Sequence, residues 1–275
     1  MSLSVNTNAG ALIALQNLNS TESQLQSAQN QVSTGLAISS PSDNGAVWAI
    51  AQNQRSDSTA LDSVTQSLQR AQSTIDVATS AGASVSDLLN QLKSKALAAS
   101  DTSLDTASRS ALNADFSSIL IQIQTVVSNA SFNGANLISS GGKSLFALDN
   151  ANGSSFLTVG AQSLALGGTN ITLASTASIS TATAASTLIS TINTSIENVN
   201  NALAKLGTSS NAISGQLTFV ANLQDTIDTG VGNLVNANLA KESAQLQALQ
   251  TKQQLGIQAL SIANSGSSAL LSLFR

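Results

Sequence analysis

A heptad repeat of apolar residues that begins at Leu61 constrains this chain more than any other feature. Small or apolar side chains recur at alternating steps of three and four residues, and none of them is charged: Leu61, Val64, Leu68, Ala71, Ile75, Ala78, Gly82, Val85, Leu89, Leu92 and Ala96. A repeat of this length is typical of a coiled-coil helix. Residues 61–96 are therefore predicted to form a long helix with one buried stripe.

Further helical stripes precede and follow the middle of the chain. Residues 101–105 interrupt the first repeat, and Thr102 with Asp105 has the spacing of a capping box that starts a new helix, whose stripe is Leu112, Phe116, Ile119, Ile123, Val126 and Ala130. A later stripe runs from Ala185 to Leu206 and, past a polar interruption at residues 207–211, from Ile213 to Leu234. These helices are expected to pack as an antiparallel bundle.

The segment between the helical halves has a different composition. Residues 132–183 are rich in Gly, Asn, Ser and Thr, with short alternating pieces at 144–148, 156–159 and 170–173 that predict small β-hairpins. The expected organisation is a terminal helix over 1–42, a helical half over 43–131, the hairpin region over 132–183, a second helical half over 184–234 and a second terminal helix over 235–275.

Both ends of the chain are apolar and nearly uncharged. Glu22 is the one charge between residues 2 and 42, where apolar positions recur until residues 39–41 are expected to break the helix. An isolated helix with one apolar stripe needs a partner, and the opposite face here carries mainly Ser, Asn, Gln and Ala, which suits a multi-helix environment. From these residues alone, the partner is either the other terminal helix or another chain.

Composition excludes several function classes. The chain has 9% charged residues, a net charge of −4, and no His or Cys, so it cannot supply a Ser-His-Asp triad, a Cys nucleophile or an ordinary zinc site. A Ser hydrolase would need a nucleophile elbow, and no Gly-x-Ser-x-Gly occurs. No basic face is available for nucleic acid, no apolar run is long enough for a membrane span, and no basic residue precedes Arg55 as a signal peptide would require. We expect no enzyme, cofactor, metal, nucleic-acid partner or membrane partner.

Three separated motifs resemble the bacterial flagellins. The segments 5–8, 11–12, 16–18 and 32–46 resemble the family's amino-terminal signature, residues 129–134 resemble its segment after the second helix, and residues 259–264 and 270–275 resemble its carboxy-terminal end. They occur in the family's order and span nearly everything except the middle. The resemblance implies a mostly α fold: a long antiparallel coiled-coil rod, paired terminal helices that form an inner tube, and a small β-hairpin region without large outer domains.

The resemblance also implies a function. It predicts a subunit that polymerises non-covalently into the extracellular flagellar filament for swimming motility and is exported unfolded through the flagellar type III apparatus. Expected partners are further copies of the chain or paralogous flagellins, the export apparatus and its chaperone, and the cap and junction proteins. A hook-filament junction protein, which shares the terminal helices, is the alternative.

Apolar residues of the two ends are the predicted polymerisation contacts: Leu12, Leu15, Leu18, Leu25, Val32, Leu246, Leu249, Leu260, Leu270, Leu271 and Phe274. A second site departs from the family. Where vertebrate innate-immune receptors read an Arg, a Leu and a Glu in many flagellins, the matching positions are Gln91, Lys95 and Asp115, so that only the carboxylate is kept.

Overall fold

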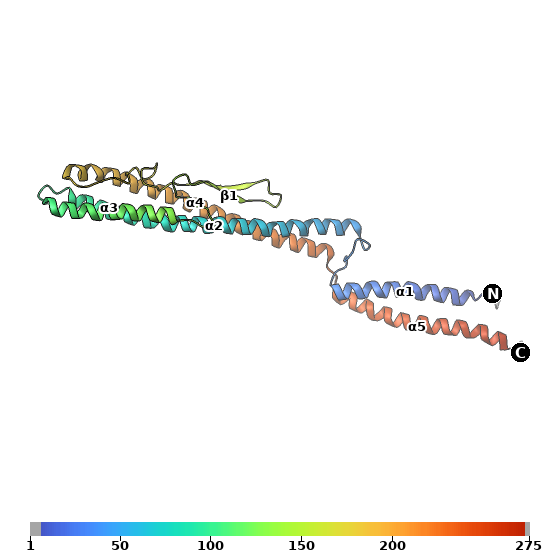
Figure 1. Ribbon diagram of the computed structural model, residues 1–275. Coiled ribbons are helices and arrows are strands. Elements are labelled where there is room, and N and C mark those ends of the chain that lie inside the picture. The colour runs from blue at the N-terminus through green and yellow to red at the C-terminus, as the bar shows by residue number, and fades with distance from the viewer. Residues whose placement is uncertain (1–6, 273–275) are drawn as a thin grey trace. The chain divides into compact units, whose positions relative to one another are not determined.

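Five helices and one two-stranded sheet make up the described part of this computed structural model, which covers residues 7–272, with side chains described through residue 265. The elements are α1 (Ala9–Thr34), α2 (Gly45–Ala99), α3 (Thr106–Asn129), β1 (Leu145–Leu148), β2 (Phe156–Val159), α4 (Ala182–Val235) and α5 (Leu239–Ser272), as labelled in Figure 1. The chain divides into two compact units, one of residues 1–56 with 226–275 and the other of residues 57–225. Each unit is described by itself.

The heptad repeat forms the core of the second unit, and the predicted long helix is confirmed. Every member of the repeat from Leu61 to Ala96 lies on α2 and is buried. Gln72 Nε2 donates to Ser210 Oγ at 2.7 Å, and Gln224 Nε2 donates to the Ser58 carbonyl at 3.1 Å, so α4 runs antiparallel to α2. The apolar stripes meet along this direction, which places the unit's core between the helices.

Helix α3 begins later than its capping box predicts. Asp105 itself is the N-cap: its carboxylate accepts from the Ser108 N–H at 2.8 Å and the Ser108 hydroxyl at 2.7 Å. Arg109 holds the preceding turn, because its guanidinium donates to the carbonyls of Ala99, Asp101 and Leu104. The Thr102 and Asp105 pairing expected from the spacing was wrong, since an Asp can cap a helix without a reciprocal partner.

The polar interruption at residues 207–211 does not break α4. Ser209 and Thr208 donate their hydroxyls to carbonyls one turn earlier on the same helix, at 3.0 Å each. Their hydroxyl groups are thus satisfied inside the helix, and tertiary packing on either side overrides their weak helix propensity. The end of the predicted stripe also differs: Leu234 is exposed and Val235 is buried instead.

The middle segment packs onto the helices through a few polar anchors and a row of apolar side chains. The Leu148 N–H donates to Ser67 Oγ on α2, Gln216 on α4 donates to the Asp149 carbonyl, and Asn113 on α3 accepts from the Ile179 N–H at 2.7 Å. The fully or almost fully buried side chains of the segment include Leu137, Ile138, Leu164, Ile171, Leu173 and Ile179. This segment therefore completes the core of the second unit.

The hairpin predicted at 144–148 and 156–159 is confirmed as the antiparallel pair β1–β2, with Leu145 opposite Val159 and Leu148 opposite Phe156. Alternation buries Ala147 and Val159 on one face, while Phe146 and Phe156 lie exposed on the other. The piece at 170–173 forms one isolated bridge, between Leu166 and Ile171, and no strand.

Candidate assembly surface

The terminal helices pair with each other in the first unit. Asn8 Nδ2 donates to the Ala263 carbonyl at 2.7 Å, and a Cβ placed on Gly256 would lie 3.3 Å from Leu18 Cδ1. Both contacts join the start of α1 to the later part of α5, so the helices are antiparallel and lie side by side (Figure 1). Gly256 allows the two backbones to approach closely at Leu18.

A small apolar core lies further along this pair. Leu25, Ala28 and Leu249 are buried together, and Leu246 packs against them. Thr21 is buried beside them and donates its hydroxyl to the Asn17 carbonyl at 2.8 Å, which satisfies its polar group. The sequence left open whether the terminal helices pack against each other or against another chain. These residues pack against the other terminal helix of the same chain.

Helix α1 ends earlier than the sequence predicts. Gly35 adopts φ +72°, and its N–H donates to the Gln31 carbonyl at 2.9 Å. A left-handed glycine directly after the last turn is a common helix stop. The helix therefore ends at Thr34, before the Ser-Ser-Pro segment at 39–41 that was expected to break it.

The segment after Gly35 joins α1 to the ends of α2 and α4. Ala37 N–H donates to the Val235 carbonyl at 2.7 Å, and Ala237 N–H donates to the Gly35 carbonyl at 2.9 Å. A second apolar cluster covers this crossing and consists of Ala51, Val231 and Val235, with Leu36, Ile38, Val47 and Ile227 packed against it. The crossing is thus fixed by both backbone pairing and burial.

Asp43 orders the loop that leads into α2. Its carboxylate accepts from the N–H groups of Ser40 and Ser39, both at 2.9 Å, and from both hydroxyls. These bonds, of which the backbone bond from Ser40 contributes most, hold the pKa of Asp43 below its ordinary value. Asn44 then caps α2 by accepting from the Val47 N–H at 3.2 Å.

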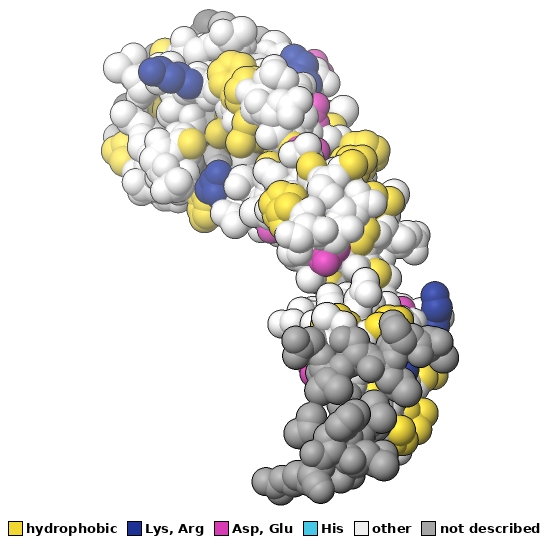
Figure 2. Space-filling view, turned by 90° about the vertical axis from the view of Figure 1, so that its right-hand side faces the viewer, with side chains coloured by type: hydrophobic (Ala, Val, Ile, Leu, Met, Phe, Trp, Pro, Cys, Tyr) yellow, Lys and Arg dark blue, Asp and Glu magenta, His cyan; other side chains and the backbone are white. Residues whose placement is uncertain are grey.

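Large apolar side chains remain exposed on this helix pair. On α1, Leu12 is 62% and Ile13 60% exposed, and on α5, Leu255 is 60%, Ile257 53% and Ile262 72% exposed. Figure 2 shows apolar side chains at the surface among many polar ones and few charged ones. The expectation that the outer faces carry mainly Ser, Asn, Gln and Ala was incomplete, because these apolar residues interrupt them.

The predicted polymerisation residues fall into four groups. Leu25 and Leu249 are buried inside the pair, and Leu18, Val32, Leu246 and Leu260 are half-buried. Leu12 and Leu15 are exposed and line a groove of about 390 Å³ with Leu260, Ala11 and the polar residues Thr7, Asn8 and Asn264. The side chains of Leu270, Leu271 and Phe274 lie outside the described residues.

The sequence reasoning missed four exposed residues, because they lie off the helix faces that its regularly spaced apolar positions define: Ile13, Leu255, Ile257 and Ile262. Leu255 and Ile257, for example, lie on either side of Gly256, which faces Leu18 of α1. The signal that could have found them is the presence of large aliphatic residues off the stripe in a helix with almost no charge.

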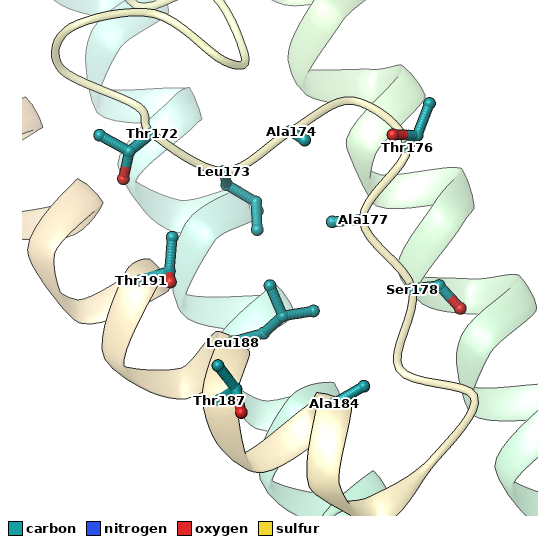
Figure 3. A pocket seen from close by; sticks show the side chains of 10 residues that line it. All are labelled: Thr172, Leu173, Ala174, Thr176, Ala177, Ser178, Ala184, Thr187, Leu188 and Thr191. Atoms are coloured by element: carbon teal, nitrogen blue, oxygen red, sulfur yellow. The ribbon is translucent and has the colours of Figure 1, made fainter.

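Another pocket lies in the second unit. It has a volume of about 490 Å³ and lies between the segment 172–178 and the start of α4, where Leu173 and Leu188 point toward each other among threonines (Figure 3). Its lining has no charged or titratable side chain, so it offers no acid, base or metal ligand for catalysis. Among the described residues, no cluster of acidic side chains could hold a metal ion, and no helix combines the length and apolar character needed to cross a membrane.

Lys95 and Asp115, which the resemblance matched to two of the receptor-read positions, also lie in the second unit. Lys95 on α2 and Asp115 on α3 form an ion pair, with Nζ and Oδ2 2.6 Å apart. The lysine and the carboxylate are therefore engaged with each other across the two helices.

Comparison with known proteins decides the family. Residues 5–143 match the bacterial flagellin N-terminal helical region, and residues 189–274 match the bacterial flagellin C-terminal helical region. Flagellin FljN of Caulobacter vibrioides is 57% identical over 272 residues, which cover 99% of this chain and 98% of that protein. This chain belongs to the bacterial flagellins.

Other flagellins are also similar along their whole length. Flagellin FljK of Caulobacter vibrioides is 55% identical, with coverage of 99% of this chain and 98% of its own, and a flagellin of Brucella melitensis is 38% identical, with 99% of each chain covered. A crystal structure of Bacillus cereus flagellin covers 56% of this chain and 88% of its own at a TM-score of 0.49 and 20% identity. As a flagellin, this chain is a structural subunit of the extracellular flagellar filament.

Proposed function

We propose that this flagellin polymerises through the α1–α5 pair, and that each pair contacts neighbouring copies on more than one side. The observation that supports this is the distribution of exposed aliphatic residues around α5. Leu255 and Ile262 are seven residues apart and lie on one side of the helix, whereas Ile257 lies about 200° away from Leu255, since each residue turns the helix by about 100°.

A helix that is apolar on several sides is normally buried. In the single chain, α1 covers only one side of α5, so a dimer formed through one face would still leave aliphatic residues in water. Contacts on several sides suit an open helical polymer built from repeated head-to-tail interfaces. The alternative, a hook-filament junction protein, has no such support, since the relatives named above are all flagellins.

Low charge favours close packing of identical copies. Glu22 is the one charged residue in α1 and the two described residues before it. The described part of α5 carries Lys241, Glu242 and Lys252. Copies that pack closely bring the charges of one subunit near those of its neighbours, and here few charges are available to repel one another.

The eleven predicted residues then divide by role. Leu25 and Leu249, with Leu246 beside them, hold the two helices of one chain together, while Leu12 and Leu15 present apolar surface to neighbours. Leu18, Val32 and Leu260 contribute to both. Leu270, Leu271 and Phe274, whose side chains lie outside the described residues, stay predicted contacts.

Membership of the family supports the finer assignments that we propose. Residues 1–42 and 235–275 form the inner-tube part, residues 43–131 and 184–234 form the rod, and residues 132–183 form its hairpin region. The subunit is exported through the flagellar type III apparatus with a chaperone, meets the cap and junction proteins, mixes with paralogous flagellins, and has no enzymatic activity, cofactor, nucleic-acid partner or membrane partner.

Seeded polymerisation of purified subunits tests the proposal. Leu255→Ser and Ile262→Ser each remove an exposed aliphatic group without touching the buried core, so the helix content of the monomer is expected to stay unchanged. Burying such a side chain contributes about 1.5–3 kcal/mol, so each variant should raise the critical concentration by at least about tenfold. Gln254→Ser is the matched control on the same helix and should assemble normally.

Unchanged critical concentrations for both aliphatic variants would refute the role of this surface. A chain that ends at Asn264 tests the remaining residues, because it removes Leu270, Leu271 and Phe274 together. We expect no tubes from it after seeding, and tubes of normal yield would remove those three residues from the contact.

A further inference from the structure

Three Asn-Gly steps occur in the sequence, at residues 44–45, 133–134 and 152–153. This dipeptide is open to a spontaneous reaction, because glycine has no Cβ to shield its backbone nitrogen from the neighbouring carboxamide. The reaction requires that the asparagine side chain is free and that the backbone can rotate so that the glycine nitrogen reaches Cγ. All three asparagines are exposed, so exposure does not distinguish them.

Asn44 is held at a helix start. Its Oδ1 accepts from the Val47 N–H at 3.2 Å and its carbonyl accepts from the Trp48 N–H at 2.9 Å, while Gly45 is the first residue of α2. Both the carboxamide and the backbone are therefore fixed by the cap.

Asn133 is held in a closed two-residue turn. The N–H of Phe132 donates to the Ala135 carbonyl and the N–H of Ala135 donates back to the Phe132 carbonyl, both at 2.9 Å. Asn133 and Gly134 adopt φ +50° and +79° between these bonds. Rotation about the Asn133 backbone would break both bonds of the turn.

Asn152 lies in the loop between β1 and β2, which is fixed by several hydrogen bonds at its base and by a single long one at its tip. The Asn150 side chain accepts from the N–H groups of Ser154 and Ser155 and donates to Ser154 Oγ. The Asn152 carboxamide takes part in no hydrogen bond among those of the described residues. The Gly153 N–H donates to the Asn150 carbonyl at 3.3 Å, beyond the usual range for such bonds.

We propose that Asn152 is a site of spontaneous deamidation and isomerisation, and that the folded structure protects the other two Asn-Gly steps. The Gly153 nitrogen loses its proton to solvent and forms a bond to Asn152 Cγ, the bond from Cγ to Nδ2 breaks, and ammonia leaves. Water then opens the five-membered imide at either carbonyl and leaves aspartate or isoaspartate. One water is consumed, one ammonia is released, and nothing is oxidised or reduced.

The products change the loop in two ways. Either product adds one negative charge, which takes the net charge from −4 to −5. Isoaspartate also routes the main chain through the side chain and adds a methylene to the loop that joins the two strands. The inference concerns this chain's own chemistry and does not depend on its assembly.

Timed incubation of the full chain in mildly alkaline heavy-oxygen water tests the proposal, followed by peptide mass spectrometry. Only deamidation during the incubation incorporates the heavy isotope, and chromatography separates aspartate from isoaspartate. We expect the Asn152 peptide to convert at least about tenfold faster than the Asn44 and Asn133 peptides, because opening of their hydrogen-bonded structure limits the reaction there. In concentrated urea the three rates should converge.

Asn152→Gln should abolish the isoaspartate signal of that peptide and leave the other two unchanged. Asn150→Ala, which removes the clamp at the base of the loop, should speed conversion at Asn152. Equal rates at the three steps of the folded chain would overturn the proposal, and so would a faster rate at Asn44 or Asn133. A preference for Asn152 that persists unchanged in urea would show that the fold is not its cause.

Discussion

Gly82 gives the sharpest test of packing in the rod-like second unit. A Cβ added there would lie 2.6 Å from Leu203 Cδ2 and 3.3 Å from Leu164 Cδ1. Leu164 is fully buried and Leu203 is half-buried, so the added methyl group fits only if the end of the Leu203 side chain shifts from its packed position. Forcing a methyl group into a filled core costs about 1–3 kcal/mol, whereas replacing glycine by alanine inside a helix gains about 1 kcal/mol.

The net expectation for Gly82→Ala is a loss of about 1 kcal/mol, since the packing cost exceeds the helix gain. Gly207 and Gly215 on α4 are matched controls, because a Cβ at either position meets no atom within 4 Å. Gly207→Ala and Gly215→Ala should therefore each stabilise the unit by about 1 kcal/mol. The three substitutions are chemically identical and differ only in the space around the methyl group.

The assay must report on residues 57–225. Trp48, the one tryptophan, lies in the other unit, so a probe inside residues 57–225 is needed. Urea titration followed by hydrogen exchange of α2 and α4 peptides supplies one, and heating should show melting shifts of about 2–4 °C in the two directions. A Gly82→Ala chain as stable as the Gly207→Ala chain would refute the claim that the Gly82 contact is filled.

Three further predictions concern local interactions. Arg109→Ala should lower the free energy of unfolding by about 1–3 kcal/mol and speed hydrogen exchange after Ala99, because three carbonyls lose their donor. Hydrogen bonds from Ser108 hold the pKa of Asp105 below its ordinary value. The stability that they contribute is therefore complete above a pH of about 4 and is lost as the pH falls below it. In urea titrations at a series of pH values, Asp105→Asn should remove this loss of stability at low pH. Gly35→Ala should destabilise the first unit by about 1–2 kcal/mol through its left-handed backbone alone, measured by Trp48 fluorescence, since a Cβ at Gly35 meets nothing within 4 Å.

The sequence predicts the buried stripes well and the ends of elements less well. The heptad from Leu61 to Ala96 specifies one buried face, and burial of that face decides the helix. Helix α1 ends where Gly35 adopts a left-handed backbone conformation. The Ser-Ser-Pro segment at residues 39–41 is also a helix-stop signal, so the sequence alone does not show which of the two ends the helix. The start of α3 depends on which of two acceptors, Thr102 or Asp105, takes the cap, and spacing alone does not decide between them.

The assembly surface was predictable only in part for a related reason. Periodicity identifies residues that share a face, so it found Leu25 and Leu249, which bind the partner helix of the same chain. The exposed residues Leu255, Ile257 and Ile262 share no single face, and a method that seeks one stripe discards them. The middle segment carries little periodicity at all, because single anchors such as Asn113 fix its course over the helices.

Helical reconstruction of filaments assembled from this chain tests the central claim most directly. The account predicts that Leu255, Ile257 and Ile262 are buried against neighbouring copies on different sides of α5, while Leu25 and Leu249 still pack within one subunit. Filaments in which those three side chains face solvent, or in which Leu25 packs against Leu249 of another copy, would contradict it.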